Sequence, residues 1–308
     1  MQPTELPIVV GLGEVLWDCF AESRLPGGAP ANVAFHACQL GCRGIVCSRV
    51  GQDPLGDELL AFLVGQGLET DWVQRDRVHP TGTVTVDTSR PDHPRFIIHE
   101  NVAWDALDFD AATEMLMGRA AAVCFGTLAQ RSPGSRQTIQ RTIRAVRPDC
   151  LVVYDVNLRQ HFYDRERLEA SLRAAAIVKL NAEEVIEIDK LLGLDSPDQE
   201  RFARALQERY GVDTVCITRG DRGCLLVGPD RIVDDPGTPV RVADAVGAGD
   251  AFTAALILAR LRRWPLESQA SFANAVGALV ASRPGAMPLL REEFTRLTAG
   301  YGGGLNDE

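Results

Sequence analysis

The chain has 308 residues, 45% of them hydrophobic, which is enough to bury a substantial core in one globular unit. Its formal net charge of −10 and sequence pI near 5.1 disfavour nucleic acid and anionic membranes as partners, because both require a clustered Lys/Arg face. No apolar run is long enough to span a bilayer, and residues 1–5 lack the basic start of a secretory signal. We therefore expect a cytoplasmic protein with a single domain, residues 1–308.

Eight cysteines occur along the chain, most of them inside apolar runs, a placement typical of free, buried thiols. Cys38, Cys42 and Cys47 lie close together in the sequence, but no second Cys or His pair follows at zinc-finger spacing. We therefore expect no metal site there. His36 lies in the same run and is expected to pack in the core.

Strands and helices alternate through the first 65 residues. A Gly27-Gly28 pair leads into a helix that has Pro30 in its first turn and Gly41 just past its end. Asn32 stands out, because asparagine is a poor helix former; it is either a displaced cap or an amide that faces a ligand. In chain order, the pattern predicts strands at residues 6–13, 14–20 and 44–50, and helices at residues 30–40 and 54–65.

Residues 81–99 alternate polar and apolar side chains about a turn at residues 89–94, which is typical of a β-hairpin. Together with the strand at residues 17–20, this hairpin could form a small β lid made of about residues 15–25 and 81–104. One face of such a lid would be apolar and exposed unless a ligand or a second subunit covered it. We therefore expect a homodimer that forms through the lid.

The alternation of strands and helices resumes near residue 120. We expect strands at residues 121–125, 151–155, 177–180 and 212–218, and helices at residues 133–146, 165–175, 182–192 and 196–210. This order predicts an α/β protein whose central sheet is mostly parallel and is covered by helices on both faces.

Polar residues follow three of these strands directly, at the edge of the sheet where such proteins bind ligands. They are Asp155, Asn157, Arg159, Asn181, Glu184, Thr218, Arg219 and Gly220. Each could instead be a helix cap or a surface residue. Because several strand ends carry such residues in one chain, we expect a binding site at this edge.

The segment 247–250, Gly-Ala-Gly-Asp, lies between an extended stretch at residues 239–242 and an apolar helical run at residues 251–261. Small residues at a helix N-terminus let backbone N–H groups approach an anion, and the helix dipole attracts negative charge. Asp250 is then placed to accept a proton from an attacking hydroxyl. The alternative is a glycine turn before a core helix, with Asp250 as an exposed charge.

Three motifs resemble those of the ribokinase or PfkB family of carbohydrate kinases. They are Gly-Gly-Ala-Pro-Ala-Asn at 27–32, Asn-Ala-Glu-Glu at 181–184 and Asp-Ala-Val-Gly-Ala-Gly-Asp at 244–250. The first motif, with Asp-Val-Asn-Leu-Arg at 155–159, looks most like the fructokinase branch. The chain departs from the family at Ala245, where Thr is usual. The resemblance spans nearly the whole chain and implies a ribokinase-like three-layer sandwich with a mostly parallel central sheet, helices on both faces and a small β lid.

The resemblance implies an ATP-dependent kinase that transfers the γ-phosphoryl group to a primary hydroxyl of a small sugar, with fructose favoured. 2-Keto-3-deoxygluconate, ribose and a nucleoside stay open as substrates. A non-catalytic relative that binds sugar or nucleotide is a second alternative, but its simplest mark would be the loss of Asp250, which is present. An NAD-dependent oxidoreductase is disfavoured, because Gly11-Leu12-Gly13 lacks a third glycine and does not open a helix.

The resemblance also assigns roles to single residues. In the family, Asp250 is the catalytic base, and Gly247, Ala248 and Gly249 form the anion hole for the transferred phosphoryl group. Matches to sugar-binding positions are Asp18, Gly28 and Asn32, and Arg159 could contact sugar or phosphate. Matches to nucleotide-binding positions are Asn181, Glu184, Thr218, Gly220 and Asn274.

Two cations are implied by the same resemblance. Glu184 would hold Mg²⁺ through water, which suits a cation that loses its hydration shell reluctantly. The family's K⁺ site corresponds here to two loops, with Asp244 and Val246 in the first and Val280, Arg283 and Gly285 in the second. Pro284 and Gly285 should force the second loop out of helical geometry, so that carbonyl oxygens can turn toward one point.

Overall fold

The computed structural model describes residues 5–87 and 95–302. Within them, the larger sheet has nine strands, in the spatial order β13 (Ile232–Asp235), β12 (Cys224–Val227), β11 (Thr214–Thr218), β10 (Ile177–Asn181), β9 (Leu151–Asp155), β8 (Ala122–Phe125), β1 (Ile8–Leu12), β4 (Arg43–Gly51) and β5 (Val73–Asp76). Strands β12 and β13 run antiparallel to their neighbours, and the other pairs are parallel. The prediction of a mostly parallel sheet is confirmed.

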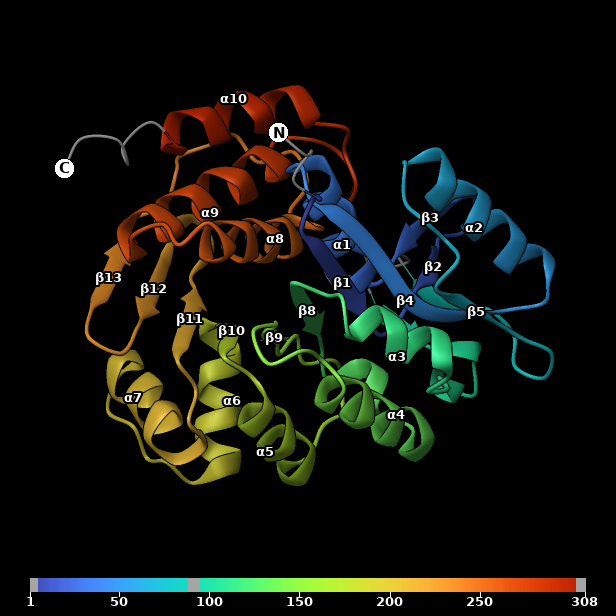
Figure 1. Cartoon of the computed structure of the whole chain (residues 1–308), viewed down its shortest axis with the longest axis horizontal. Coiled ribbons are helices and arrows are strands. Elements are labelled where there is room, and N and C mark those ends of the chain that lie inside the picture. The colour runs from blue at the N-terminus through green and yellow to red at the C-terminus, as the bar shows by residue number, and fades with distance from the viewer. Residues whose placement is uncertain (1–4, 88–94, 303–308) are drawn as a thin grey trace.

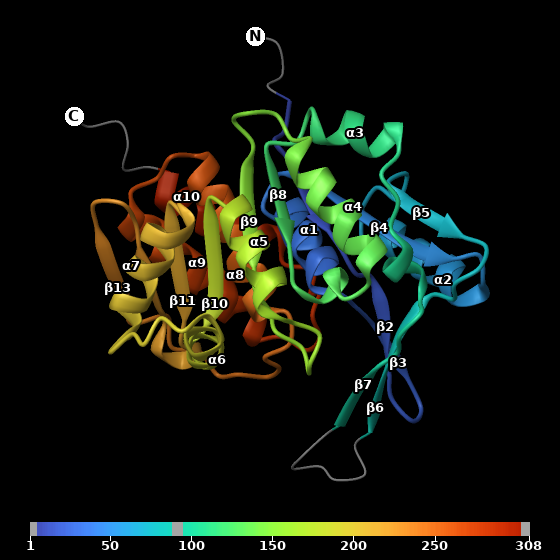
Figure 2. The same cartoon turned by 90° about the horizontal axis from the view of Figure 1, so that it is seen from below.

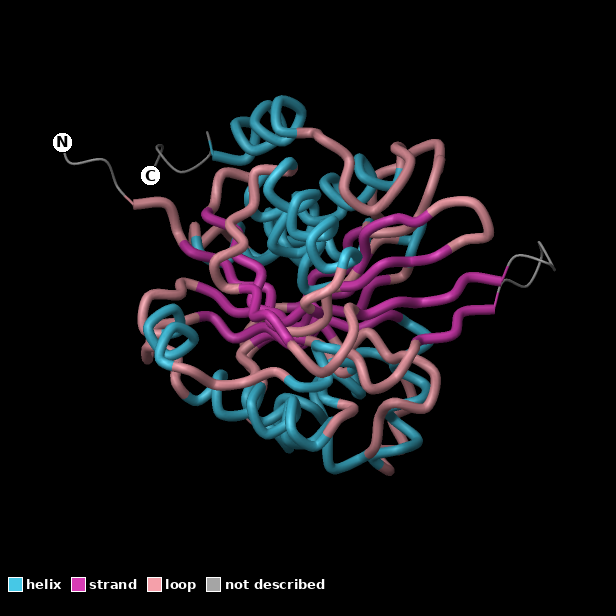
Figure 3. The backbone as a smooth tube through the Cα atoms, turned by 90° about the vertical axis from the view of Figure 1, so that its right-hand side faces the viewer, coloured by secondary structure: helices cyan, strands magenta, loops and turns pink. Residues whose placement is uncertain are grey.

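Helices cover both faces of this sheet, as predicted (Figures 1 and 3). One layer contains α1 (Ala29–Gln39), α2 (Pro54–Gly65), α8 (Ala248–Leu261), α9 (Leu266–Ala281) and α10 (Arg291–Gly302). The other contains α3 (Ala111–Met117), α4 (Pro133–Arg144), α5 (Arg165–Ala174), α6 (Ala182–Leu192) and α7 (Gln199–Tyr210). None of the described helices is both long and apolar enough to cross a membrane.

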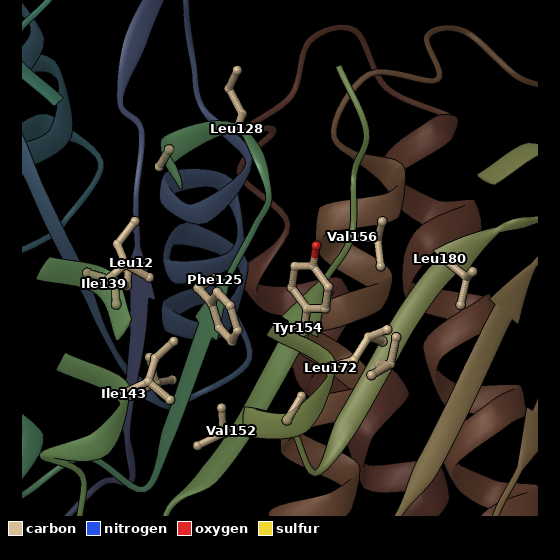
Figure 4. Packing of buried hydrophobic residues seen from close by; sticks show 14 of the residues in the cluster. Leu12, Phe125, Leu128, Ile139, Ile143, Val152, Tyr154, Val156, Leu172 and Leu180 are labelled. Carbon is tan, nitrogen blue, oxygen red and sulfur yellow. The ribbon is translucent and has the colours of Figure 1, made fainter. Parts of the chain in front are cut away.

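Side chains alternate across a sheet, so successive residues of a strand pack on opposite faces. Among the described residues, one core lies beneath α3–α7, and the other face of the sheet carries two, one with α8 and α9 and one between α1, α2 and β4. Phe125 and Tyr154 belong to the core beneath α3–α7, and their rings stack with centroids 5.0 Å apart (Figure 4). The Tyr154 hydroxyl lies 2.6 Å from that of Thr127, which satisfies its hydrogen-bonding need inside the core. Val153 and Ile177 point to the opposite face and pack with α8 and α9.

The lid is a second sheet of four described strands, in the order β3 (Arg24–Gly27), β2 (Leu16–Cys19), β6 (Gly82–Asp87) and β7 (Arg95–Ile98). It projects from the body of the molecule (Figure 2). The hairpin prediction is confirmed by the antiparallel pairing of β6 with β7, while the predicted turn at residues 89–94 lies outside the described residues. Asp18 stands opposite Leu25 and Val84, so these three side chains share one face of the lid.

The lid is tied to the body through Arg131. Its guanidinium donates to both carboxylate oxygens of Asp105, at 2.8 Å each, and lies 4.0 Å from the centroid of the Trp104 ring. It also donates to the carbonyl of His99, which directly follows β7. Trp17 anchors the other side of the lid by donating to the carbonyl of Leu55 on α2, at 3.0 Å.

Candidate active site

The predicted anion site is the first turn of α8. Gly247 is the N-cap residue and has φ 78°, which glycine adopts without strain. A Cβ atom at this position would lie 2.5 Å from the carbonyl oxygen of Ala286, so the close approach of two loops also requires glycine. Helix α8 begins at Ala248, and its first-turn N–H groups lack intrahelical partners. The N–H group of Ala248 donates to the carbonyl of Ala245 at 3.3 Å, whereas no backbone acceptor among the described residues is bound to the N–H groups of Gly249 and Asp250. These two groups are therefore available to an anion.

Asp250 lies on this first turn and contacts a residue far away in the sequence. Asn32 of α1 donates to the Asp250 carboxylate through Nδ2, at 2.7 Å, while its own Oδ1 is buried without a hydrogen-bond partner. Burial and the charge of Asp155 raise the pKa of Asp250 to about 6, although Lys179, Asn32 and Arg159 each act to lower it. The structure thus joins the 27–32 motif to the 244–250 motif at one carboxylate.

Glu14 is a second carboxylate at this site, and sequence reasoning missed it. It is 4% exposed, and its Oε2 has no hydrogen-bond partner. Burial raises the pKa of Glu14 to about 7; Asp250 raises it as well, and Arg159 lowers it. A charged residue between the buried runs of β1 and β2 was the signal that could have drawn attention to it.

On the lid side, Asp18 and the glycine pair lie together. A Cβ atom on Gly27 would stand 2.6 Å from Asp18 Oδ2, and one on Gly28 would stand 2.4 Å from the carbonyl oxygen of Glu14. Burial raises the pKa of Asp18 to about 6, and Arg159 lowers it. Arg159 is exposed and donates to the Leu158 carbonyl at 3.1 Å, yet its charge acts on Asp18, Glu14 and Asp250 alike.

Beneath α8, a hydrogen-bonded group of buried polar side chains joins the helix to the sheet. Lys179 Nζ donates to both oxygens of Asp155, at 3.0 and 3.1 Å, and Thr253 Oγ1 donates to Asp155 Oδ2 at 2.8 Å. Asp155 was among the expected strand-end residues, whereas Lys179 and Thr253 were not. A lysine inside the apolar run Ile177–Leu180 was the available signal.

Asn181 and Glu184 form a capping box at the start of α6. Asn181 Oδ1 accepts from the N–H groups of Glu183 and Glu184, at 2.9 Å each. The Glu184 carboxylate accepts from Asn181 N at 2.8 Å and from Leu158 N at 2.7 Å. Burial raises the pKa of Glu184. A structural function therefore accounts for the contacts seen here, and a ligand function stays a prediction.

Thr218, Gly220 and Asn274 lie on elements that meet near the start of β12. Thr218 pairs with Cys224 across the two strands, and Asn274 of α9 donates to Cys224 Sγ at 3.3 Å. Asn274 also donates to Asp235 Oδ1 at 2.7 Å. Gly220 opens a short 3-10 turn, Gly220–Arg222, directly after β11. The three expected nucleotide-side positions are thus on neighbouring elements.

The two loops of the expected monovalent-cation site are in contact. Asp244 accepts from Gly285 N through Oδ2 and from Val246 N through Oδ1, both at 3.0 Å. The N–H groups of Ala243 and Asp244 donate to the carbonyl of Ala281, the last residue of α9, at 2.8 and 3.2 Å. Gly285 has φ 78°, so the backbone leaves helical geometry there, as predicted. Val280 is buried within α9, and Arg283 lies beyond its end.

Comparison with known proteins identifies the family to which the sequence is similar. The family model "pfkB family carbohydrate kinase" matches residues 8–292. The uncharacterized sugar kinase PH1459 of Pyrococcus horikoshii is 30% identical over 305 residues, covering 93% of this chain and 94% of that protein. Fructokinase-1 of Oryza sativa subsp. japonica is 30% identical over 313 residues, covering 93% and 95%.

Solved structures agree with the sequence relatives. The structure of PH1459 in complex with ATP has a TM-score of 0.78 at 29% identity, covering 94% of this chain and 99% of that one. A fructokinase from Xylella fastidiosa with bound ATP has a TM-score of 0.83 at 23% identity, covering 96% and 99%, and supports the fold. The ribokinase-like fold is therefore confirmed, and the chain belongs to the pfkB family of carbohydrate kinases.

Proposed function

We propose that this sugar kinase transfers the γ-phosphoryl group of ATP to a primary hydroxyl of a small sugar, with fructose as the favoured substrate. The contact between Asn32 and Asp250 is the observation that carries this proposal, because it brings the sugar-side motif within hydrogen-bond distance of the base beside the anion site. The fructokinases of rice and maize among the relatives support fructose, and the ATP complex of PH1459 supports ATP.

In this proposal Asp250 accepts the proton of the attacking hydroxyl, and the N–H groups of Gly247, Ala248 and Gly249 stabilise charge on the transferred group. A pKa of about 6 keeps Asp250 largely ionised at neutral pH. That pKa is far below the pKa of an alcohol. In a metaphosphate-like transition state, however, the proton leaves late, so that positioning of the base matters more than its basicity.

Asp18, Gly28 and Asn32 are proposed to hold the sugar hydroxyls, with Arg159 over sugar or phosphate. Two observations support this arrangement. Asn32 Oδ1 is a buried acceptor without a donor, which a sugar hydroxyl can supply. Gly28 has φ 110° and no room for a side chain against the Glu14 carbonyl, so the close packing of the 27–32 motif against the segment that leads to Asp18 requires glycine.

Asn181, Glu184, Thr218, Gly220 and Asn274 are proposed to form the nucleotide side of the site. Mg²⁺, when bound with ATP, supplies positive charge that offsets the negative charge of the phosphates. Glu184 fits an indirect role toward this cation, because each of its oxygens already accepts one backbone N–H and retains capacity to accept from a metal-bound water.

We further propose a K⁺ site at Asp244, Val246, Val280, Arg283 and Gly285. The oxygen-rich chemistry of the two loops fits, since a carboxylate and the carbonyls of a helix C-terminus meet there. The ion would fix the loop that leads into Gly247. Assays in tetramethylammonium buffer, with and without added KCl or NaCl at constant ionic strength, test this proposal: we expect K⁺ to raise turnover or nucleotide affinity, and identical rates would refute it.

The substrate is tested with a panel of sugars in a coupled ADP-release assay, with purified protein, ATP and Mg²⁺. We expect fructose to give the highest kcat/KM, above 2-keto-3-deoxygluconate, ribose and a nucleoside. A higher value for one of the other three would replace fructose while leaving the kinase in place. If no sugar in the panel drove ADP release while calorimetry still detected sugar and ATP binding, the protein would be a non-catalytic relative.

A further inference from the structure

Lys179, Asp155 and Thr253 form a polar cluster, here called the α8 floor, between the central sheet and the first turn of α8. All three residues are buried: Lys179 is 8% exposed, Asp155 3% and Thr253 0%. They come from β10, β9 and α8, which places them where a shift of the helix relative to the sheet would break their hydrogen bonds. The proposed function assigns none of them a role.

The α8 floor lies directly beneath the proposed anion hole. A Cβ atom on Gly249 would stand 3.3 Å from Lys179 Nζ, so the ammonium group lies against the backbone of the helix's second residue. The hydroxyl of Thr253 lies 2.9 Å from the Gly249 carbonyl as well as 2.8 Å from Asp155. The cluster therefore links the sheet to the segment that carries Asp250.

Lysine itself is unusual in this chain. Of the 32 Lys and Arg residues, two are lysines, Lys179 and Lys190, and Lys190 is exposed. The chain thus uses arginine almost everywhere and a lysine at its buried floor. A compact ammonium donates to both Asp155 oxygens and still fits under Gly249, whereas a broad guanidinium fork would need more space. The space beneath the helix therefore accounts for the choice of residue.

A buried ion pair is a poor way to gain stability. Removing two charges from water carries a desolvation penalty that can exceed their mutual attraction, and apolar replacements are often as stable. Elsewhere the buried part of α8 is mainly apolar, with Ala251, Phe252, Ala254 and Leu256 in its core cluster, and such contacts have no fixed direction. The hydrogen bonds of the floor are directional, so they can set the position of the helix more closely than the apolar contacts do.

Resting on the proposed function, we propose that Lys179 and Asp155 are positioning residues: they hold the first turn of α8 so that its N–H groups and the Asp250 carboxylate are aimed at the transferring phosphoryl group. Lys179 also offsets the repulsion between the carboxylates of Asp155 and Asp250. Neither residue needs to touch the substrate to do this.

The charges around the α8 floor predict the direction in which the pKa of Asp250 should change when one of them is removed. Asp250 is faced by Asp155 from β9, Lys179 from β10, Arg159 from the loop after β9, and Glu14 from the connection between β1 and β2. Glu184 of α6 acts on Lys179. Lys179 lowers the pKa of Asp250 and Asp155 raises it, so removal of one charge should have the opposite effect to removal of the other.

Turnover is the first test. The double variant Lys179→Met/Asp155→Leu removes both charges together, so it should fold with a Tm close to that of the wild type. We expect its kcat to fall about 10- to 100-fold, because a small misplacement of reacting groups is costly, while KM for the sugar changes little. Lys190→Met is the matched control and should behave as the wild type. A double variant with wild-type kcat, or a loss of kcat matched by a loss of folded protein, would overturn the proposal.

The second test does not depend on turnover. Carboxyl ¹³C NMR of aspartate-labelled protein follows the titration midpoint of Asp250. We expect Lys179→Met to raise this midpoint and Asp155→Asn to lower it, with the acidic limb of kcat/KM moving in the same directions. Unchanged or parallel shifts would overturn the charge-balancing role even if the protein proved inactive on every sugar, whereas an inactive wild type with opposed shifts would count against the proposed function alone.

Discussion

The two sheets of the molecule differ in how they are buried. The nine-stranded sheet is covered on both faces, and its polar residues Asp155, Asn181 and Thr218 each occupy the last position of a strand. The lid sheet leaves apolar side chains exposed: Leu25 is 48% exposed and Phe96 53%. The covered sheet can hold reacting groups in fixed positions, whereas the lid can adjust to a ligand. We therefore expect changes in the central sheet to alter kcat and changes in the lid to alter KM.

The largest effect is expected at Asp250, on the first turn of α8, which packs on the central sheet. Replacement of Asp250 by Asn keeps the size of the side chain and removes the proton acceptor, so turnover should fall at least ~10²-fold with nucleotide affinity nearly unchanged. Steady-state kinetics and ATP titration measure the two quantities. Asp230→Asn, at an exposed turn, is the control. Near-normal turnover in Asp250→Asn would remove Asp250 from the mechanism.

Glu14 should affect stability through pH. Its pKa of about 7 lies above the ordinary value of 4.5, so the folded state binds the proton more tightly than the unfolded state does. The contribution of Glu14 to the free energy of unfolding should therefore be fully present below pH 4.5 and be lost as the pH rises through 7. The loss should be roughly 3 kcal/mol. Glu14→Gln should remove this loss. Urea denaturation at pH 5 and pH 8 measures it, with exposed Glu200→Gln as control; equal pH dependence in wild type and Glu14→Gln would contradict the prediction.

Asp18 tests the lid. Asp18→Asn removes a charged acceptor for a sugar hydroxyl, and we expect KM for the sugar to rise about 10-fold while kcat stays within about 3-fold of wild type. Glu22→Gln, in the exposed turn between β2 and β3, is the control within the same sheet. A fall in kcat with unchanged KM would break the division between lid and central sheet.

The smallest effect on catalysis is expected when the proposed dimer is disrupted. Leu25 and Phe96 share the lid face that carries Asp18, since β2, β3, β6 and β7 pair in register. Replacement of both by Lys should convert a dimer to a monomer with kcat per chain little changed. Light scattering at micromolar concentration measures the mass, and Val78→Lys, at an exposed apolar residue outside the lid, is the control. A wild-type protein that is already monomeric would refute the dimer.

The sequence by itself determined the elements whose signals are local. Helix α2 spans Pro54–Gly65, as predicted, because Asp53 caps it and Pro54 suits its first turn. Helix α6 spans Ala182–Leu192, as predicted, because Asn181 and Glu184 cap each other's backbone within one turn. Strands β3, β5, β12 and β13 and helix α3 were missed, since elements of four to seven residues carry little periodicity of their own. Helix α10 was missed as well.

The tertiary structure alone decided which of these residues meet. Asn32 and Asp250 are 218 positions apart, and their hydrogen bond exists because α1 and α8 pack on the same face of the sheet. In the sequence, Lys179 is an unexplained charge in an apolar strand. In the structure, Asp155 of β9 accepts hydrogen bonds from both Lys179 and Thr253 of α8, which accounts for the buried ammonium group. Likewise, only the fold determines that Glu14 is buried and that its Oε2 has no hydrogen-bond partner. Periodicity and capping act over a few residues, whereas the charge, burial and aim of a side chain depend on neighbours that only the fold brings near.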